Sequence, residues 1–168
     1  MRRPTGSGAG LLLALAVVSL GACSTRTLSA AQLSVGHAWA RPTPGGATNG
    51  VVYLDVLSPV ADSIVSVTVP TDVASAAELH ETMTTGGTSP MANMPQMATG
   101  GTMTMAPVSA VDVRANEVVR FTPGGLHIML VGLRHSLTMQ QHFTITLHLK
   151  VAGAISTDVL VSNEAPSR

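Results

Sequence analysis

Hydrophobic and polar residues alternate with a period of two along most of the chain after residue 33. The clearest run is Phe143–Val151, in which every second residue is apolar and those between are Thr, His or Lys. Successive side chains of a strand point to opposite faces, so this run predicts a strand with one buried and one solvated face. The residues expected on the buried face are Phe143, Ile145, Leu147, Leu149 and Val151.

Shorter runs of the same kind predict further strands, separated by Pro and Gly residues typical of turns. No apolar period of 3.6 residues extends far enough for a long helix, and Val73–Ala77 would form one helical turn at most. Many short strands with turns between them predict an all-β sandwich or small barrel. The predicted strands are Leu33–Ala40, Gly50–Leu57, Ile64–Val69, Ala77–Met83, Glu117–Phe121, Leu126–Val131 and Ile155–Val161.

The first 22 residues have the pattern of a secretory signal peptide. Arg2 and Arg3 precede the apolar stretch Leu11–Leu20, which is shorter than the about 20 residues that a membrane-spanning helix needs. The sequence Leu-Gly-Ala-Cys23 follows directly and resembles a bacterial lipobox, in which the cysteine is acylated and becomes the mature N-terminus. We therefore expect residues 1–22 to be removed, Cys23 to carry the lipid, with chains such as palmitate, and residues 23–32 to act as a tether. An ordinary signal peptide that contains a cysteine is the alternative.

Composition excludes several functional classes. Charged residues make up 11% of the chain, aromatic residues 2%, and the formal net charge is zero. A nucleic-acid-binding protein would need a basic surface and usually stacking aromatics, so no such partner is expected. A single cysteine cannot form an intramolecular disulfide or a thiolate zinc cluster. We find no hydrolase, zinc-protease, phosphate-loop or dinucleotide motif, and we do not expect an enzyme.

The chain is rich in side chains that bind soft metals, with nine Met and six His. His127 and Met129 lie two apart in a predicted strand, so their side chains should share a face. His80 and Met83 lie on another predicted strand. Thioether sulfur is soft and favours Cu(I), whereas the scattered carboxylates do not indicate a calcium or magnesium site.

Four segments resemble the PCu(A)C copper chaperones of the bacterial cell envelope. They are His37-Ala-Trp-Ala-Arg-Pro-Thr-Pro-Gly-Gly46, Glu78-Leu-His-Glu-Thr82, Met105-Ala-Pro-Val108 and Pro123-Gly-Gly-Leu-His-Ile-Met-Leu-Val-Gly-Leu133. The family's copper motif is a His, a later Met and then His-x-Met, and the 21 residues between Met105 and His127 match its spacing.

The resemblance implies a cupredoxin-like antiparallel β-sandwich or barrel over residues 33–163. It also implies that Cu(I) is held by two His and two Met and delivered to the copper-site subunit of cytochrome c oxidase or to another copper chaperone. The protein is then expected to be a monomer, anchored by lipid outside the cytoplasm, with its copper site at the surface so that the ion can be released. The implied ligands are His80, Met105, His127 and Met129.

The chain departs from the family in the 24 residues between His80 and Met105, more than the family usually has. Within them, Thr84–Thr104 is low in complexity and predicted to be a loop. This insertion leaves open whether Met103 or Met105 is the ligand. It could form an auxiliary copper site or serve only as a spacer, and the tail 164–168 has no His or Met to play that part. The candidate auxiliary ligands are Met83, Met91, Met94, Met97 and Met103.

Of three other interpretations, the first fails on its ligands and the other two remain. A blue-copper electron carrier needs a cysteine thiolate, and the single cysteine is assigned to the lipid. A lipoprotein without metal would be indifferent to loss of His127. A copper-buffering or resistance lipoprotein is the nearest alternative to a chaperone. We expect Trp39 and Tyr53 to lie in or beside the core, Met139 to fill the core, and the remaining histidines to be structural: His37, His135, His142 and His148.

Overall fold

The computed structural model describes residues 33–85 and 102–166, and every regular element in these ranges is a β-strand. The predicted all-β class is therefore confirmed. The strands are β1 (Ser34–Ala40), β2 (Asn49–Leu57), β3 (Asp62–Thr68), β4 (Ala74–Thr85), β5 (Thr102–Pro107), β6 (Val111–Val113), β7 (Val118–Phe121), β8 (Leu126–Leu133), β9 (His142–Leu149) and β10 (Gly153–Val161).

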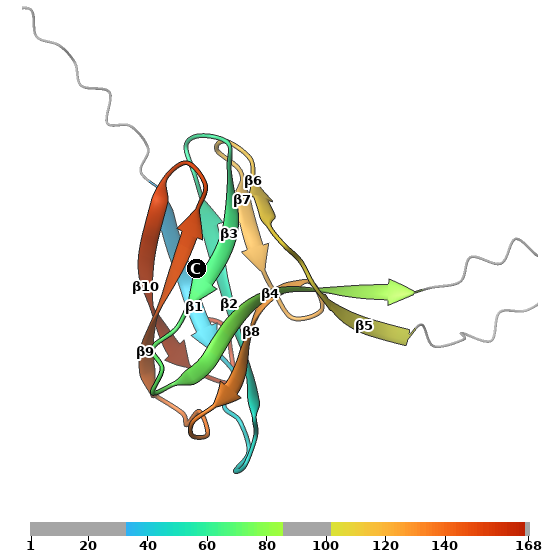
Figure 1. Ribbon diagram of the computed structural model, residues 1–168, viewed down its shortest axis with the longest axis vertical. Helices are drawn as coiled ribbons and strands as arrows, with labels where there is room; N and C mark the ends of the chain where they lie inside the picture. Colours follow the sequence, from blue (N-terminus) through green and yellow to red (C-terminus); the bar gives the residue numbers. More distant parts are fainter. Residues whose placement is uncertain (1–32, 86–101, 167–168) are drawn as a thin grey trace, which may run out of the picture.

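Seven of the strands close into a barrel (Figure 1). The order is β4-β8-β2-β1-β10-β9-β3, and the pairing of Val67 in β3 with Ala77 in β4 closes the circle. All neighbours are antiparallel except β1 and β10, which run parallel. The barrel leaves its seven strands without a continuous free edge, and β5, β6 and β7 pair with the parts of β4, β3 and β2 that extend beyond their barrel neighbours.

The barrel interior is filled by the alternating apolar residues that the sequence predicts. In β9, Phe143, Ile145, Leu147 and Leu149 are all buried. Val151 was expected with them, but it is 68% exposed because β9 ends at Leu149 and a turn follows. The aromatic rings of Trp39 and Tyr53 are buried, as expected, and their centroids lie 4.9 Å apart.

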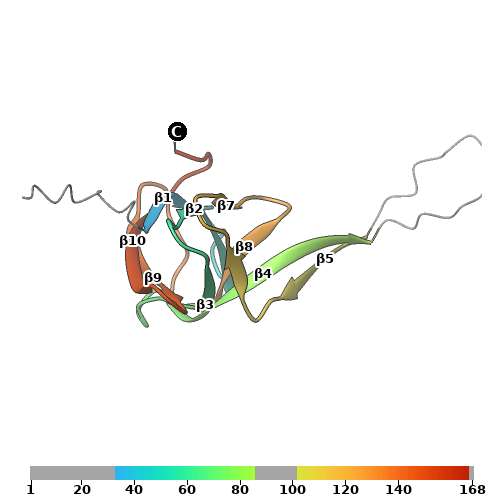
Figure 2. The same ribbon diagram turned by 90° about the horizontal axis from the view of Figure 1, so that it is seen from above.

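Two strands were not predicted, and one of them changes the picture of the methionine-rich region. β5 pairs with β4 from Thr102↔Thr85 to Pro107↔His80, so the predicted loop Thr84–Thr104 is wrong at both ends. β4 and β5 extend together away from the barrel as a two-stranded arm (Figure 2). The sequence Thr-Met-Thr-Met-Ala-Pro lacks the β-branched apolar residues that usually indicate a strand. It forms a strand because its main chain pairs with β4.

One smaller expectation, of at most one helical turn at Val73–Ala77, holds, and another is wrong, each for a local reason. Val73–Ala77 forms no helical turn: β4 begins at Ala74, after a turn in which the N–H groups of Val73 and Ala74 both donate to the Pro70 carbonyl. Met139 does not fill the core but is 47% exposed, because it lies in the turn before β9 rather than on a strand.

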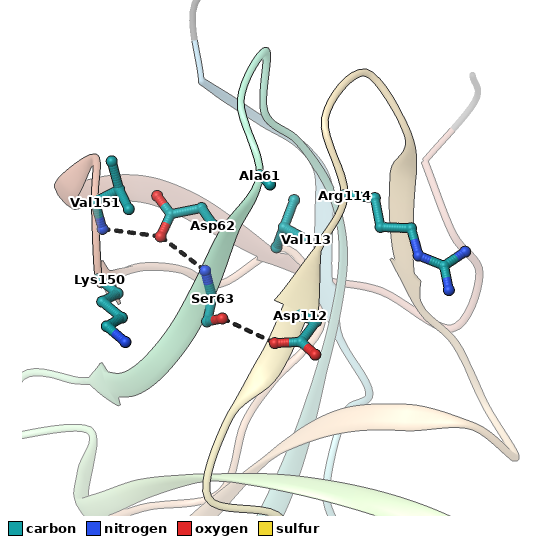
Figure 3. Close-up of a pocket in the computed structure, with 8 residues that line it drawn as sticks. All are labelled: Ala61, Asp62, Ser63, Asp112, Val113, Arg114, Lys150 and Val151. Atoms are coloured by element: carbon teal, nitrogen blue, oxygen red, sulfur yellow. Dashed lines mark hydrogen bonds between the residues drawn. The ribbon is translucent and has the colours of Figure 1, made fainter.

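A hollow of about 440 Å³ lies beside β3, β6 and the β9–β10 turn, away from the predicted ligands (Figure 3). Its buried carboxylate, Asp62, accepts hydrogen bonds from the main-chain N–H groups of Ser63, Val151 and Ala152 at 2.7 to 2.9 Å. Burial alone would raise the pKa of Asp62, but the main-chain N–H donors outweigh it and lower this pKa. Asp62 therefore links the β9–β10 turn to β3 by hydrogen bonds, a structural role that was not predicted from the sequence.

The predicted signal peptide, the lipid-bearing Cys23 and the loop methionines Met91, Met94 and Met97 lie outside the described residues. Within residues 33–85 and 102–166, no helix is long and apolar enough to cross a membrane.

Candidate metal centre

The strand register brings the four predicted ligands to one face of the sheet formed by β5, β4 and β8. His80 in β4 lies directly across from His127 in β8, and Met129 lies across from Glu78, two residues before His80. On the other side of β4, Met105 lies across from Thr82, two residues after His80. Residues two apart in a strand share a face, so all four predicted ligands point to the same side. The alternate residues Leu79 and Ile128 are buried in the core on the opposite side.

The two histidine rings are neighbours and both are buried. Their centroids are 5.7 Å apart and their planes are inclined by 45°. His80 is 8% exposed and His127 is 3% exposed. We expected a site at the surface, and for the imidazoles this is wrong: both are buried, although they lie on the opposite face of the sheet from the core residues Leu79 and Ile128.

Each ring uses one nitrogen in a hydrogen bond and leaves the other without a partner. His80 Nε2 lies 3.1 Å from Glu78 Oε2, and His127 Nδ1 lies 3.0 Å from the Gly125 carbonyl oxygen. His80 Nδ1 and His127 Nε2 are buried and have no hydrogen-bond partner among residues 33–85 and 102–166. Leaving a buried polar atom without a hydrogen-bond partner costs about 1–3 kcal/mol of stability. Two such atoms in neighbouring rings therefore indicate a binding site for a ligand. A metal ion that accepts both lone pairs would remove this cost.

The sequence Pro-Gly-Gly before β8 explains how His127 is held. The Gly125 N–H donates to the Thr122 carbonyl at 3.0 Å, which closes a four-residue turn with Pro123 second and Gly124 third. Gly124 has φ of +82°, the conformation that the third position of a type II turn requires and that side chains disfavour. The turn aims the Gly125 carbonyl at both His127 Nδ1 and the Thr82 N–H of β4.

The methionines differ in exposure and in face. Met105 is 60% exposed and lies at the solvent-facing end of the candidate site, whereas Met129 is partly buried. Met83 is 51% exposed but lies across from Thr104, on the opposite face of the arm from Met105. The structure therefore separates Met83 from the four predicted ligands. Met103 lies two residues before Met105 in β5, so its position places it on the same face as Met105.

The other histidines make ordinary structural contacts, as expected. His37 Nδ1 lies 3.2 Å from Asp55 Oδ2, and His148 Nε2 lies 3.1 Å from Thr68 Oγ1. His142 is paired with Asp158, and His135 contacts the Ser136 carbonyl. None of them has a buried nitrogen without a partner.

The donor set at the His80–His127 pair selects against hard metals. No group of three or more His, Cys, Asp or Glu side chains that could hold a metal ion occurs among the residues that the structure describes. The thioethers of Met105 and Met129 lie on the same face as the two imidazoles. Two imidazoles with thioether sulfur suit Cu(I) better than zinc, magnesium or calcium. The Glu78 carboxylate and the Gly125 carbonyl, which contact the two rings, were not predicted from the sequence, although Glu-x-His in a strand and Pro-Gly-Gly before one could have indicated them.

The closed barrel with a histidine–methionine face defines a cupredoxin-like domain. The family described as "Putative lipoprotein LpqE-like" matches residues 33–99 and 88–161. The chain therefore belongs to the LpqE-like family. A curated relative, "Putative lipoprotein Lxx21020" of Leifsonia xyli subsp. xyli, is 30% identical over 115 residues, 68% of this chain. The aligned part spans 60% of that relative's length.

Solved structures of PCuAC domains share the fold. The apo PCuAC domain from PmoF1 is 22% identical, with a TM-score of 0.56 over 80% of this chain and 95% of that one. The copper-bound PCuAC domain from PmoF2 is 21% identical, with a TM-score of 0.56 over 82% and 97%. Cu(I)-bound DR1885 from Deinococcus radiodurans is 22% identical, with a TM-score of 0.53 over 86% and 88%. The resemblance to PCu(A)C chaperones is thus confirmed at the level of the fold.

Proposed function

We propose that this protein binds Cu(I) through His80, Met105, His127 and Met129. The observation that carries the proposal is the pair of buried imidazole nitrogens that have no hydrogen-bond partner. The shared face of the four residues supports it, as does the copper bound in the PmoF2 and DR1885 structures. Thioether ligands form no disulfides, so such a site would hold Cu(I) outside the cytoplasm without thiol chemistry.

We further propose that the protein is a copper chaperone rather than an enzyme. The imidazoles are buried, while Met105 is largely exposed. An exposed, neutral sulfur is the ligand that an acceptor would displace first when copper moves by ligand exchange. The proposed acceptor is the copper-site subunit of cytochrome c oxidase, with another copper chaperone as the second candidate. A lipid at Cys23 would keep donor and acceptor at the same membrane.

The test compares two exposed methionines on opposite faces of the same arm. Met105→Leu removes the sulfur on the His80 face, and Met83→Leu removes one on the other face. Both are measured in the full chain carrying Cys23→Ser, so that no thiol competes, by anaerobic Cu(I) titration against a competing chelator in detergent. We expect Met105→Leu to weaken the tightest Cu(I) site by tenfold or more and Met83→Leu to leave it unchanged. Equal affinities in both variants would refute the assignment of Met105.

A buffering or resistance role is the alternative, and cells distinguish it from delivery. Cys23→Ser should release the protein from the membrane without changing the Cu(I) affinity of the domain. Under the delivery hypothesis, cells that rely on this protein then lose oxidase activity, most clearly at low copper. Unchanged oxidase activity together with increased copper sensitivity would favour buffering.

A further inference from the structure

The two imidazoles of the candidate site are held by different nitrogens. His80 is engaged through Nε2 by the Glu78 carboxylate, and His127 is engaged through Nδ1 by the Gly125 carbonyl. Both partners are oxygen atoms that only accept hydrogen bonds. Since a neutral imidazole carries one proton, the engaged nitrogen of each ring must be the protonated one.

The remaining nitrogens therefore carry lone pairs, and they differ between the rings. They are Nδ1 in His80 and Nε2 in His127, the same two atoms that are buried without a partner. We propose that the protein fixes its two histidines in opposite tautomers before copper arrives, so that the ion is bound through Nδ1 of His80 and Nε2 of His127. This inference rests on the proposed function for the identity of the ion, but the tautomers themselves are a property of the metal-free protein.

The two rings also differ in the kind of group that holds their protonated nitrogen. The partner of His127 is a main-chain carbonyl, held by the turn that Pro123 and Gly124 form and bound as well to the Thr82 N–H. The partner of His80 is a side chain, Glu78, which lies on the same face of β4 and whose side chain is 50% exposed. Glu78 touches neither nitrogen that is left for the metal. It is a positioning residue that acts through His80, in the manner of the carboxylates that orient metal-binding histidines elsewhere.

Fixed tautomers lower the cost of binding. If His80 were free to carry its proton on Nδ1, a fraction of the molecules would present an N–H to the incoming ion. Loss of a carboxylate that orients a metal ligand typically lowers metal affinity by about 10–100-fold. We expect a loss of this size when Glu78 is replaced by an apolar residue.

The tautomers are read directly by long-range ¹H–¹⁵N NMR of the ¹⁵N-labelled, metal-free chain carrying Cys23→Ser in detergent. His80 should show a protonated Nε2 and a bare Nδ1, and His127 the reverse. One equivalent of Cu(I), which is diamagnetic, should then shift the ¹⁵N signals of the two bare nitrogens and leave both N–H nitrogens protonated. The same tautomer in both rings, or a metal-induced shift at His80 Nε2, would overturn the inference. Correct tautomers with no shift on adding Cu(I) would instead refute the proposed function.

Variants of Glu78 separate positioning from a merely structural role. Glu78→Leu should let His80 populate both tautomers and lower Cu(I) affinity about 10–100-fold. Glu78→Gln keeps an oxygen acceptor at the same place and should preserve the His80 tautomer. Glu81→Leu is the matched control, because Glu81 lies on the same strand but on the opposite face. If Glu78→Leu leaves the His80 tautomer unchanged, Glu78 does not position the ring and this part of the inference is wrong.

Discussion

Replacing His127 by Leu should stabilise the metal-free protein and abolish tight copper binding. Leu is similar to His in volume, and volume-conserving changes in a core usually cost less than about 1.5 kcal/mol. The change removes the hydrogen bond from His127 Nδ1 to the Gly125 carbonyl, which is worth about 0.5–1.5 kcal/mol. That carbonyl still accepts the Thr82 N–H, so it is not left without a partner.

The same change removes the buried His127 Nε2, an atom with no partner. Eliminating such an atom should gain about 1–3 kcal/mol. The gain exceeds the lost hydrogen bond, and we expect the metal-free variant to be more stable by about 1 kcal/mol. With Cu(I) the order should reverse, because a ligand at 1,000 times its Kd stabilises the native state by about 4 kcal/mol and the variant would lose most of this.

The assay is thermal unfolding by circular dichroism, with and without Cu(I), in the Cys23→Ser background. For a domain of this size, 1 kcal/mol corresponds to roughly 4 °C in Tm. His148→Leu is the matched control: His148 is bonded to Thr68, so its loss should bring no stabilisation and no change in copper binding. A metal-free His127→Leu protein that unfolds below the wild type, or a stability order that copper does not reverse, would refute the reasoning.

Two further predictions concern the supports of the fold. Asp62→Asn should destabilise the protein by about 1–3 kcal/mol near neutral pH, because an amide cannot accept all the main-chain N–H groups that the carboxylate binds. The pKa of Asp62 is lowered in the folded state, so its contribution to the free energy of unfolding is present above its ordinary pKa of 3.8 and is lost as pH falls through the lowered value. Urea unfolding from pH 7 downward should show the difference from wild type shrinking at acid pH, whereas a difference that grows would contradict this account. Gly124→Ala should cost about 1–2 kcal/mol because of the positive φ, and Gly45→Ala, at a turn glycine without that conformation, should cost less; equal Tm losses would exclude backbone strain as the cause.

The fold class was predictable because period-two patterning reports directly on which strand face is buried. In β9 the alternation identifies four core residues correctly and fails only at Val151, where the chain turns. β5 was not predicted because its sequence lacks β-branched apolar residues, and such a segment forms a strand by pairing with another. The pairing of β4 with β5 is a contact between segments whose connection the sequence pattern describes merely as a loop.

The candidate ligands show the same division. The local spacing of His127 and Met129 determines that they share a face, since any strand would place them so. Local spacing could not say that His80 would lie directly across from His127, that both rings would be buried, or that Met83 would be turned to the other side of the arm. Those facts depend on the register between strands far apart in the chain, where a slip of one residue would reverse every side chain.

The sequence by itself therefore determined two things. Its periodicity predicted an all-β chain, and its composition showed that the candidate metal ligands are histidine and methionine side chains and not cysteine thiolates or carboxylates. The tertiary structure decided that the two rings lie next to each other and are buried. The contacts of His80 with Glu78 and of His127 with the Gly125 carbonyl each span only two residues of the chain, whereas the pairing of His80 with His127 joins β4 to β8. Because the register between strands far apart in the chain sets which rings face each other, the position of the two nitrogens without a partner comes from tertiary structure and not from composition.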